Sequence, residues 1–328
     1  MSYKLKIFSA EDIKKAITMD EAIEAVRKAF KQLSIGKAVV PPRINLEIPE
    51  YKTTALIMSA YLPENKQIGL KLINLCENNP SRNLPLAYAI VIVSDAINGI
   101  PIAIMDGSYL TALRTGAASG VATDILSRKD SKKVAIFGAG IQGRTQLEAV
   151  CTVRNIEKAF IFDLNPEKAK LFKREMDKKL SIEIEIGESI EVISEVDIIC
   201  TATTSKTPVF PDKYIKKGVH INAIGSYKPN VREIPGETIA RAKVVVDKYE
   251  SCLKEAGDLI IPLKQKLINE KHIHAEIGEI IAGLKPGRTS YEEITFFKSV
   301  GNAVQDLAVS SLVLGKLQNE TFGLEIQL

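Results

Sequence analysis

The feature that most constrains this chain is the spacing Gly138-x-Gly140-x-x-Gly143, which directly follows the short apolar run 134–137. A strand, a glycine-rich turn and a helix in this order are typical of a dinucleotide-binding unit. Gly138 would make the tight turn, Gly140 would let the backbone approach a pyrophosphate, and Gly143 would let the helix pack on the strand. The pyrophosphate is expected at the helix N-terminus, where free N–H groups and the helix dipole favour an anion. The alternative is a glycine turn that serves only helix–strand packing.

An acidic residue, Asp163, stands where such a unit needs one, about twenty positions after the last glycine and at the end of the next apolar run. A carboxylate there can accept hydrogen bonds from the hydroxyls of the adenine ribose and would repel a 2′-phosphate. No Arg or Lys follows it immediately to bind that phosphate. We therefore expect NAD as the cofactor, with NADP less favoured.

The region that contains the glycines alternates between short apolar runs and helical stretches. The apolar runs are 133–137, 158–163, 182–187, 196–202, 220–225 and 243–247. That spacing indicates an α/β fold with a Rossmann-type, doubly wound parallel sheet and right-handed crossovers. Residues 295–317 would add a short strand and one long helix with an apolar face.

The residues before this region are predicted to form a separate, smaller α+β domain. Thr18 to Glu21 form a capping box that would open a helix ending near Gly36. A β-rich stretch follows, in which Asn98-Gly99 would make the turn of a hairpin. A further helix is expected over about 108–126.

Composition excludes several classes of protein. The chain has 328 residues, of which 45% are hydrophobic and 26% charged, with a net charge of +4, and this predicts an ordinary globular protein of two domains. It has no basic stripe with interleaved aromatic residues, so we expect no nucleic-acid partner. No apolar run is long enough to span a bilayer, and the N-terminal residues are too charged for a signal peptide. The four cysteines are scattered without a CxxC pair, which favours a reduced, cytoplasmic protein.

Three cations of the first domain stand in unusual surroundings. Arg43 follows two prolines, Lys71 interrupts an apolar strand, and Arg114 lies among small residues that leave room for close approach. An arginine fork can bind a carboxylate through two hydrogen bonds, and a lysine with a buried flank can lower its pKa and serve in acid–base chemistry. Taken singly, each could instead be a structural cation or half of an ion pair.

Other motifs carry less information. The loop 200–210 follows an apolar run and could lie over a bound nucleotide, although a plain polar loop would read the same. His220 is interpreted as a strand histidine with a satisfied hydrogen bond, and His272 and His274 as part of a charged, exposed segment. No further ligand lies near them in sequence, so we predict no metal site. The chain has neither a G-x-S-x-G elbow nor a phosphate-binding P-loop, which argues against hydrolases and kinases.

Taken together, these motifs resemble the ornithine cyclodeaminase/μ-crystallin family. The resemblance runs in order through nearly the whole chain. It is carried by residues 41–43, 69–71, 97–119, 137–146, 162–166, 201–210, 222–234 and 295–308.

The resemblance implies a homodimeric NAD(P)-dependent enzyme whose first domain, completed by the C-terminal helix, supplies the substrate site and the dimer contact. We accordingly assign 1–120 with 304–328 to a substrate-binding and dimerisation domain, and 121–303 to the dinucleotide-binding domain. By position in the motifs, Arg43, Lys71 and Arg114 match the family's substrate-carboxylate residues. Members of the family include ornithine and lysine cyclodeaminases, an archaeal type of alanine dehydrogenase, and reductases of cyclic ketimines such as Δ1-pyrroline-2-carboxylate.

One departure from the cyclodeaminases concerns Tyr227. Cyclodeaminases carry an aspartate in the motif after "IG", where it handles the side-chain amine of the substrate, and this chain has Tyr227 at that position. A phenol carries no charge at neutral pH and is a poor base. Hydride transfer between an amino acid and its imine needs no such carboxylate.

We therefore predict an NAD-dependent oxidoreductase that acts on the Cα–N bond of a small amino acid or cyclic imino acid, of the alanine dehydrogenase or ketimine reductase type. Arg43 and Arg114 would bind the carboxylate and Lys71 would relay a proton, with Tyr227 in the substrate pocket. The alternatives are an ornithine cyclodeaminase and a non-catalytic binding protein of the μ-crystallin type. The predicted cofactor-binding residues are Thr115, Gly138, Gly140, Ile141, Gln142, Gly143, Asp163, Thr201, Ala202, Thr203 and Ser299.

Overall fold

The computed structural model describes residues 2–317 and 323–328. The chain separates into two compact units, which are Met1–Arg114 with Asn302–Leu328, and Thr115–Gly301. The chain first passes from one unit to the other between Arg114 and Thr115, within the long helix α3 (Gly107–Leu126). It returns to the first unit between Gly301 and Asn302, in the connection from β14 (Thr295–Lys298) to α10 (Ala303–Leu317).

In the described part of the first unit, seven strands form a mixed sheet in the order β15-β1-β6-β5-β4-β3-β2. Neighbouring strands run antiparallel except β1 and β6, which are parallel. The strands are β1 (Lys4–Phe8), β2 (Ile44–Ile48), β3 (Thr53–Leu62), β4 (Gln67–Cys76), β5 (Ala87–Asp95), β6 (Pro101–Asp106) and β15 (Leu324–Gln327). The short 3-10 helices Pro49–Tyr51 and Pro80–Arg82 lie in the connections.

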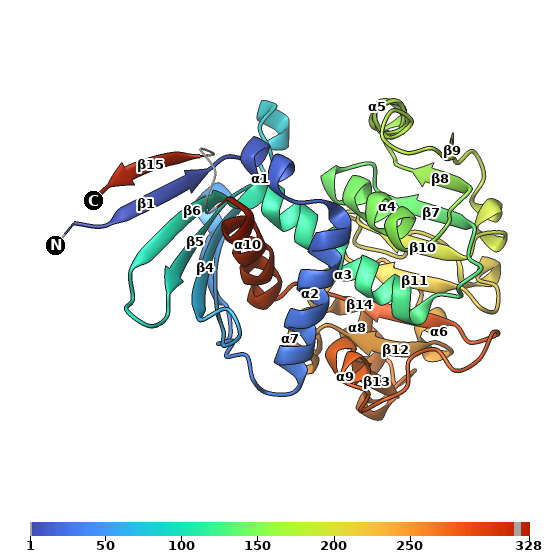
Figure 1. Ribbon diagram of the computed structural model, residues 1–328. Helices are drawn as coiled ribbons and strands as arrows, with labels where there is room; N and C mark the ends of the chain where they lie inside the picture. The colour runs from blue at the N-terminus through green and yellow to red at the C-terminus, as the bar shows by residue number, and fades with distance from the viewer. Residues whose placement is uncertain (1, 318–322) are drawn as a thin grey trace. The chain divides into compact units, whose positions relative to one another are not determined.

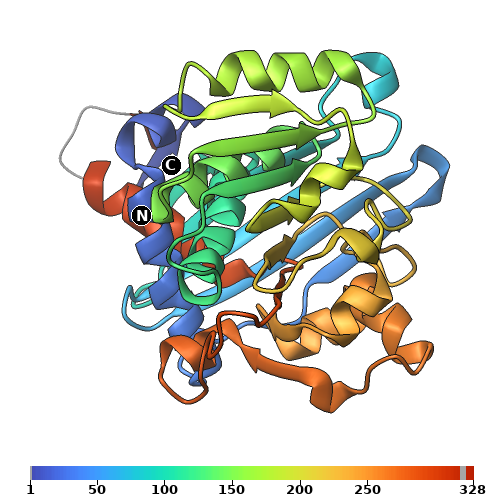
Figure 2. The ribbon, with the colours of Figure 1, turned by 90° about the vertical axis from the view of Figure 1, so that its right-hand side faces the viewer.

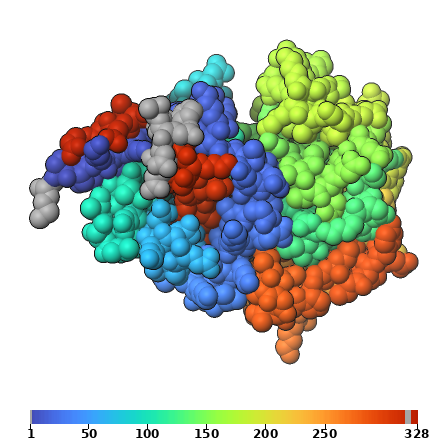
Figure 3. Space-filling model, in the orientation of Figure 1, coloured from blue at the N-terminus to red at the C-terminus, as the bar shows by residue number. Residues whose placement is uncertain are grey.

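One face of this sheet is covered by helices. The helix α10 contacts β3, β4 and β5 (Figure 1). The helix α2 (Met19–Ser34) packs along α10, and Figure 3 shows the two helices side by side on the surface. The short helix α1 (Ala10–Ala16) also contacts α10. The alternating burial in β5, in most of β3 and in the first half of β4 follows from this arrangement, because every second side chain there points at the helices. The capping box predicted at Thr18 is confirmed, since its side chain accepts from the backbone N–H of Glu21 and its own N–H donates to the Glu21 carboxylate.

The hairpin predicted around Asn98-Gly99 is confirmed as an antiparallel pair of β5 and β6, but the connection is longer than a two-residue turn. It spans residues 96–100, and Gly99 has a φ of +77°. The Asp95 carboxylate accepts the N–H of Ile97 at 2.7 Å, a hydrogen bond that stabilises the turn.

In the residues that the structure describes for the second unit, eight parallel strands form one sheet in the order β13-β12-β14-β11-β10-β7-β8-β9. Figure 2 shows these strands side by side, with α5 (Pro166–Met176) above them. The remaining strands are β7 (Lys133–Phe137), β8 (Lys158–Phe162), β9 (Glu183–Ile186), β10 (Ile198–Thr201), β11 (His220–Ala223), β12 (Lys243–Val246) and β13 (Ile273–Glu276). The helices are α4 (Ile141–Val153), α6 (Gly236–Ala240), α7 (Tyr249–Glu255), α8 (Gly257–Lys264), α9 (Ile277–Ile281) and the 3-10 turns Ile190–Ser194, Asp212–Tyr214 and Glu270–His272.

The predicted fold class, a Rossmann-type parallel sheet with a second α+β part, is confirmed. One detail of the prediction is wrong, because the segment with His272 and His274 is not simply exposed. It contributes β13, and both rings bond backbone carbonyls, His272 that of Ile239 and His274 that of Pro286. The charged residues of this segment obscured an edge strand, in which Ile273, Ala275 and Glu276 are buried. Among the described helices, none is long and apolar enough to cross a membrane.

The interpretation of His220 is confirmed. It lies in β11, fully buried, with Nδ1 3.0 Å from the Thr295 hydroxyl and Nε2 3.1 Å from the Asn222 side-chain oxygen. Burial lowers the pKa of His220 to about 3, so the ring is neutral at physiological pH. It is therefore a structural residue of the sheet.

Candidate functional site

The glycine-rich loop lies at the carboxyl end of β7, and its three glycines have different surroundings. Gly138 has a φ of +100°, and a Cβ there would lie 2.5 Å from the carbonyl oxygen of Ala202. A Cβ on Gly143 would lie 2.0 Å from the carbonyl oxygen of Gly138. Packing therefore explains both of these glycines. A Cβ on Gly140 would meet open space, so packing does not explain this one, whereas a ligand lying on the loop would.

The N-terminus of α4 faces the same open space. Gly140 is its N-cap, and within the described residues no side chain caps this end of the helix. The first N–H groups of a helix have no partner within the helix, so an uncapped end favours a bound anion. Ile141, the first helical residue, is exposed although it is large and apolar. These residues fit the pyrophosphate of a dinucleotide.

Asp163 stands directly after β8, beside this loop. One carboxylate oxygen accepts the N–H of Ala139 at 2.8 Å and the other accepts the N–H of Asn165 at 2.8 Å. Each carboxylate oxygen has a second lone pair, so a fixed Asp163 can still accept from ribose hydroxyls. The neighbouring Leu164 is fully exposed, as expected for an apolar side chain that could cover an adenine ring.

The loop after β10 is held by a carboxylate, Glu233, that no sequence motif marks as part of the cofactor site. Glu233, fully buried, accepts from the hydroxyl of Thr201 at 2.9 Å and from both the N–H and the hydroxyl of Thr203 at 2.7 Å. It also accepts the N–H of Gly225 at 2.8 Å. Glu233 thereby ties the loops after β10 and β11 to each other at the carboxyl edge of the sheet.

A buried ion pair between Asp258 and Lys298 supports Glu233. Asp258 accepts the N–H of Glu233 at 2.8 Å and binds the ammonium of Lys298 at 2.8 Å, with both charged side chains fully buried. Burial, together with the nearby Asp258 carboxylate, raises the pKa of Glu233. A carboxylate enclosed in this way by donors of its own chain acts as a structural tie.

The other predicted cofactor residues lie in the second unit as well. The hydroxyl of Ser299 donates to Asp247 at 2.7 Å, and the same carboxylate accepts the N–H groups of Val300 and Gly301. The carbonyl of Thr115 accepts from Gln146 at 3.3 Å. The segment with Ser299 is thus fixed by Asp247, which sequence reasoning missed because a lone acid after an apolar strand carries no specific pattern.

Lys71 belongs to the first unit, and its side chain lies on the face of the sheet that the helices cover. In β4 it pairs with Met58 of β3 and Val91 of β5, and all three side chains are buried. The opposite face carries its strand neighbours Leu70 and Leu72. The strand β4 thus carries apolar residues on both faces, and Lys71 is the one cation among them. This explains why the sequence shows a lysine inside an apolar run.

The Lys71 ammonium meets a carboxylate that comes from α10. Its Nζ lies 2.9 Å from Oδ1 and 2.8 Å from Oδ2 of Asp306. Arg114, on α3, donates from Nε to Asp306 Oδ1 at 3.0 Å and from Nη1 to the side-chain oxygen of Gln305 at 2.6 Å. Lys71, Arg114, Gln305 and Asp306, here called the buried cation cluster, are all buried.

The electrostatics of this cluster leave an excess of positive charge. Burial and the charge of Arg114 lower the pKa of Lys71 to about 7, although Asp306 acts in the opposite direction. The charge of Arg43, which precedes β2, lowers it further. Within the cluster, Asp306 supplies one negative charge against the positive charges of Arg114 and of protonated Lys71. A buried group with uncompensated charge is costly, so the cluster is suited to receive an anion.

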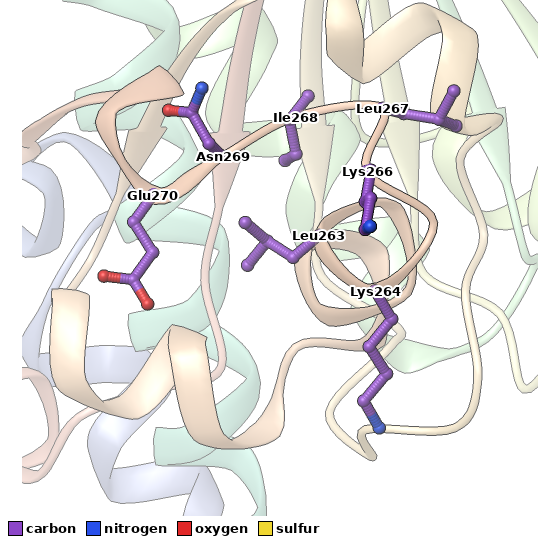
Figure 4. A pocket seen from close by; sticks show the side chains of 7 residues that line it. All are labelled: Leu263, Lys264, Lys266, Leu267, Ile268, Asn269 and Glu270. Atoms are coloured by element: carbon purple, nitrogen blue, oxygen red, sulfur yellow. The ribbon is translucent and has the colours of Figure 1, made fainter.

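The three cations singled out in the sequence are thus brought together electrostatically within one unit. Asp306 and Gln305 were missed, although adjacent polar residues on an apolar helix facing a buried lysine were a usable signal. Tyr227 lies on the loop after β11 in the second unit and is 38% exposed. A surface hollow of about 580 Å³ lies elsewhere in that unit, at the end of α8 (Figure 4), and none of the predicted site residues lines it.

The fold and these two groups of residues define a Rossmann-type oxidoreductase. A family model described as the ornithine cyclodeaminase/mu-crystallin family matches residues 4–321. A Δ1-pyrroline-2-carboxylate reductase of Bacillus cereus (strain ZK / E33L) is 41% identical over 323 residues, which are 98% of this chain and 99% of the relative. The chain belongs to the ornithine cyclodeaminase/mu-crystallin family.

Solved structures agree with this assignment. The Thermococcus litoralis Δ1-pyrroline-2-carboxylate reductase in complex with NADH and L-proline has a TM-score of 0.95 and 45% identity, covering 98% of this chain and all of that one. An archaeal alanine dehydrogenase dimer with bound NAD has a TM-score of 0.93 and 36% identity, covering 99% of each chain. The predicted family, enzyme class and type of reaction are confirmed by these relatives.

Proposed function

We propose that this protein is an NADH-dependent reductase of Δ1-pyrroline-2-carboxylate that forms L-proline. The observation that carries the proposal is the buried cation cluster, in which the single carboxylate of Asp306 faces the two positive charges of Lys71 and Arg114. A small substrate with a single carboxylate would balance that charge. The identity to pyrroline-carboxylate reductases over nearly the whole chain supports the same substrate class.

In this proposal Arg114 and Arg43 bind the substrate carboxylate. Arg114 donates from Nε to Asp306 and from Nη1 to Gln305. Its Nη2 donates to neither of these two residues of α10, and we propose that it binds the substrate carboxylate. Lys71, whose pKa of about 7 lets it hold or release a proton near neutrality, would supply the proton that the imine nitrogen needs. A bound NADH would supply the hydride for Cα, while this chain supplies orientation and charge.

NAD is proposed to bind the second unit. The loop at Gly138 to Gly143 and the N-terminus of α4 would hold the pyrophosphate, and Asp163 the adenine ribose. Thr201, Ala202 and Thr203, fixed by Glu233, would lie along the nicotinamide half with Ser299 and Thr115. Both solved relatives bind this type of cofactor, one as NADH and one as NAD.

A second candidate, an alanine dehydrogenase type of reaction, is favoured by the similarity to the archaeal enzyme. The cation cluster offers a carboxylate site but no group that distinguishes a ring from a methyl side chain. The cyclodeaminase alternative has less support, because Tyr227 replaces the expected acid. Glu233, the nearest acid along the chain, is enclosed by four donors of its own chain.

We also infer a homodimer formed through the uncovered face of the first unit's sheet. Ile44, Ile68, Leu70 and Ile90 are all exposed there, and an apolar sheet face of this kind marks a protein contact. The archaeal relative forms a dimer. The mass in solution by light scattering tests this, and Leu70→Lys should shift a dimer towards the monomer.

The scattered thiols support a cytoplasmic, reducing compartment.

The experiment that tests the function is a panel of NADH-oxidation assays. Purified protein is mixed with NADH and either Δ1-pyrroline-2-carboxylate or pyruvate plus ammonia, and the loss of NADH absorbance is followed. The proposal expects the cyclic imine to give a higher kcat/KM than pyruvate plus ammonia. The reverse order would assign the alanine dehydrogenase reaction. Cofactor binding without turnover on any imine would contradict both.

A further inference from the structure

We propose that Asp306 is a positioning residue of this site, which holds the Lys71 ammonium and the Arg114 guanidinium side by side so that both are charged when the substrate carboxylate binds. The proposal rests on the function proposed above, which it deepens. It assigns to α10 an indirect part in the chemistry, through a residue that acts on Lys71 and Arg114.

The geometry supports this role because Asp306 makes a separate contact with each cation. Both of its oxygens lie within 2.9 Å of Lys71 Nζ, and Oδ1 also accepts from Nε of Arg114 at 3.0 Å. Lys71 and Arg114 carry like charges and would repel each other in a buried site. A shared carboxylate is what allows two such groups to remain close together and ionised.

Gln305, the neighbour of Asp306, completes the arrangement. Its side-chain oxygen accepts from Arg114 at 2.6 Å, and this contact fixes which end of the amide faces the guanidinium. The amide nitrogen is buried and has no hydrogen-bond partner among the residues that the structure describes. A buried donor without an acceptor is unfavourable, so its presence next to Arg114 indicates a place where a ligand oxygen is received.

The charges around Lys71 determine what happens when Asp306 is removed. Asp306 faces it from α10, Arg114 from α3, and Arg43 from the segment before β2. Asp306 is the one of these three that stabilises the protonated form. Without it, the other two charges named here are both positive and the site is desolvated, so Lys71 would lose its proton at a lower pH.

The test compares Asp306→Asn with the wild type in the reduction of Δ1-pyrroline-2-carboxylate. We expect kcat/KM to fall roughly 100-fold, because one partner of a buried charge pair is removed. In the wild type, kcat/KM should fall at high pH as Lys71 loses its proton, and this fall is the descending limb of the pH profile. In Asp306→Asn the limb should move to lower pH by about one unit or more, since the opposite charge next to Lys71 is lost. An unchanged limb with only a loss of thermal stability would overturn the proposal.

Two further variants separate positioning from folding. In Asp306→Glu the charge is kept but displaced, so the limb should return close to the wild-type pH while kcat stays reduced; wild-type kcat and KM in this variant would contradict a positioning role. Asp197→Asn is the matched control. Asp197 is a largely buried carboxylate of the second unit paired with Arg128 at 2.6 Å and Lys216 at 3.1 Å. Its loss should lower stability without moving the limb.

A measurement without turnover distinguishes this proposal from the proposed function. The titration of Lys71 is followed by NMR of protein with isotope-labelled lysine side chains, with Lys71→Gln used to assign its signal. A lower titration midpoint in Asp306→Asn supports the role of Asp306 even if no imine is reduced, in which case the substrate assignment alone fails. An unchanged midpoint in an active enzyme overturns the role of Asp306 and leaves the function standing.

Discussion

The ammonium of Lys71 lies 2.8 Å from a carboxylate oxygen of Asp306, although 235 residues separate the two in the chain. Lys71 stands in the middle of β4 and Asp306 in α10, which packs on that strand. The helix α10 is thus a component of the first unit's buried cation cluster. The contact explains how a lysine can be buried between the apolar side chains of Met58 and Val91.

The activity should depend on the protonation of Lys71. If the ammonium form donates the proton, kcat/KM falls as the pH rises through about 7, the value to which burial and Arg114 lower the pKa of Lys71. A bound substrate carboxylate adds a negative charge and raises this pKa, so kcat should fall at a higher pH than kcat/KM. Steady-state kinetics across the neutral range measure both profiles.

The imine nitrogen of the substrate also titrates, and a second substrate separates the two groups. With the six-membered homologue Δ1-piperideine-2-carboxylate, a limb that belongs to Lys71 stays at the same pH in kcat/KM. A limb that follows the imine moves with it and would contradict the assignment to Lys71. Lys71→Gln should abolish the limb together with most of the activity.

The arginines should govern substrate affinity. We expect Arg43→Ala and Arg114→Ala to raise the KM for the imine strongly, at a cost of about 2–4 kcal/mol for each lost charge-assisted contact. The dissociation constant of NADH, measured by fluorescence titration, should change less. Arg27→Ala, which removes an arginine paired with Glu24 on α2, is the control. Wild-type KM in both variants would show that these arginines are structural.

Sequence reasoning was sufficient for features that depend on local pattern. The glycine spacing, the period of the apolar runs and the capping box at Thr18 each fix a conformation over a few residues, and the structure has them. The edge strand β13 was missed because charged residues flank its short buried core. Asp306, Glu233 and Asp247 were missed as supporting groups, because the significance of a buried carboxylate depends on partners that lie far away in the chain.

The coenzyme preference should rest on Asp163. We expect the protein to bind NAD(H) more tightly than NADP(H), since a fixed carboxylate accepts from ribose hydroxyls and repels a 2′-phosphate. Asp163→Ser should narrow or reverse the difference, as measured by calorimetric titration of both coenzymes. Glu167→Ser, which removes an exposed acid of α5, serves as the control. Equal affinity of the wild type for both coenzymes would refute the role of Asp163.

Tyr227 should make ornithine a poor substrate. Cyclodeamination needs a carboxylate near the side-chain amine, and Tyr227 offers a neutral hydroxyl. We expect slow or undetectable release of ammonia and proline from ornithine with catalytic NAD, alongside clear reduction of the cyclic imine. Tyr227→Asp tests whether a carboxylate at this position raises the ornithine reaction. Faster turnover of ornithine than of the imine in the wild type would show that another acid does this work.

The most direct test of the whole account follows the hydride itself. The protein is incubated with Δ1-pyrroline-2-carboxylate and NADH that carries deuterium at C4 of the nicotinamide, and the proline formed is analysed by NMR and mass spectrometry. The account predicts one deuterium per molecule, at Cα of L-proline, when the transferred face is labelled, and none when the opposite face is labelled. Proline without deuterium from either label, or no proline at all, would contradict hydride transfer to the Cα of a cyclic imino acid.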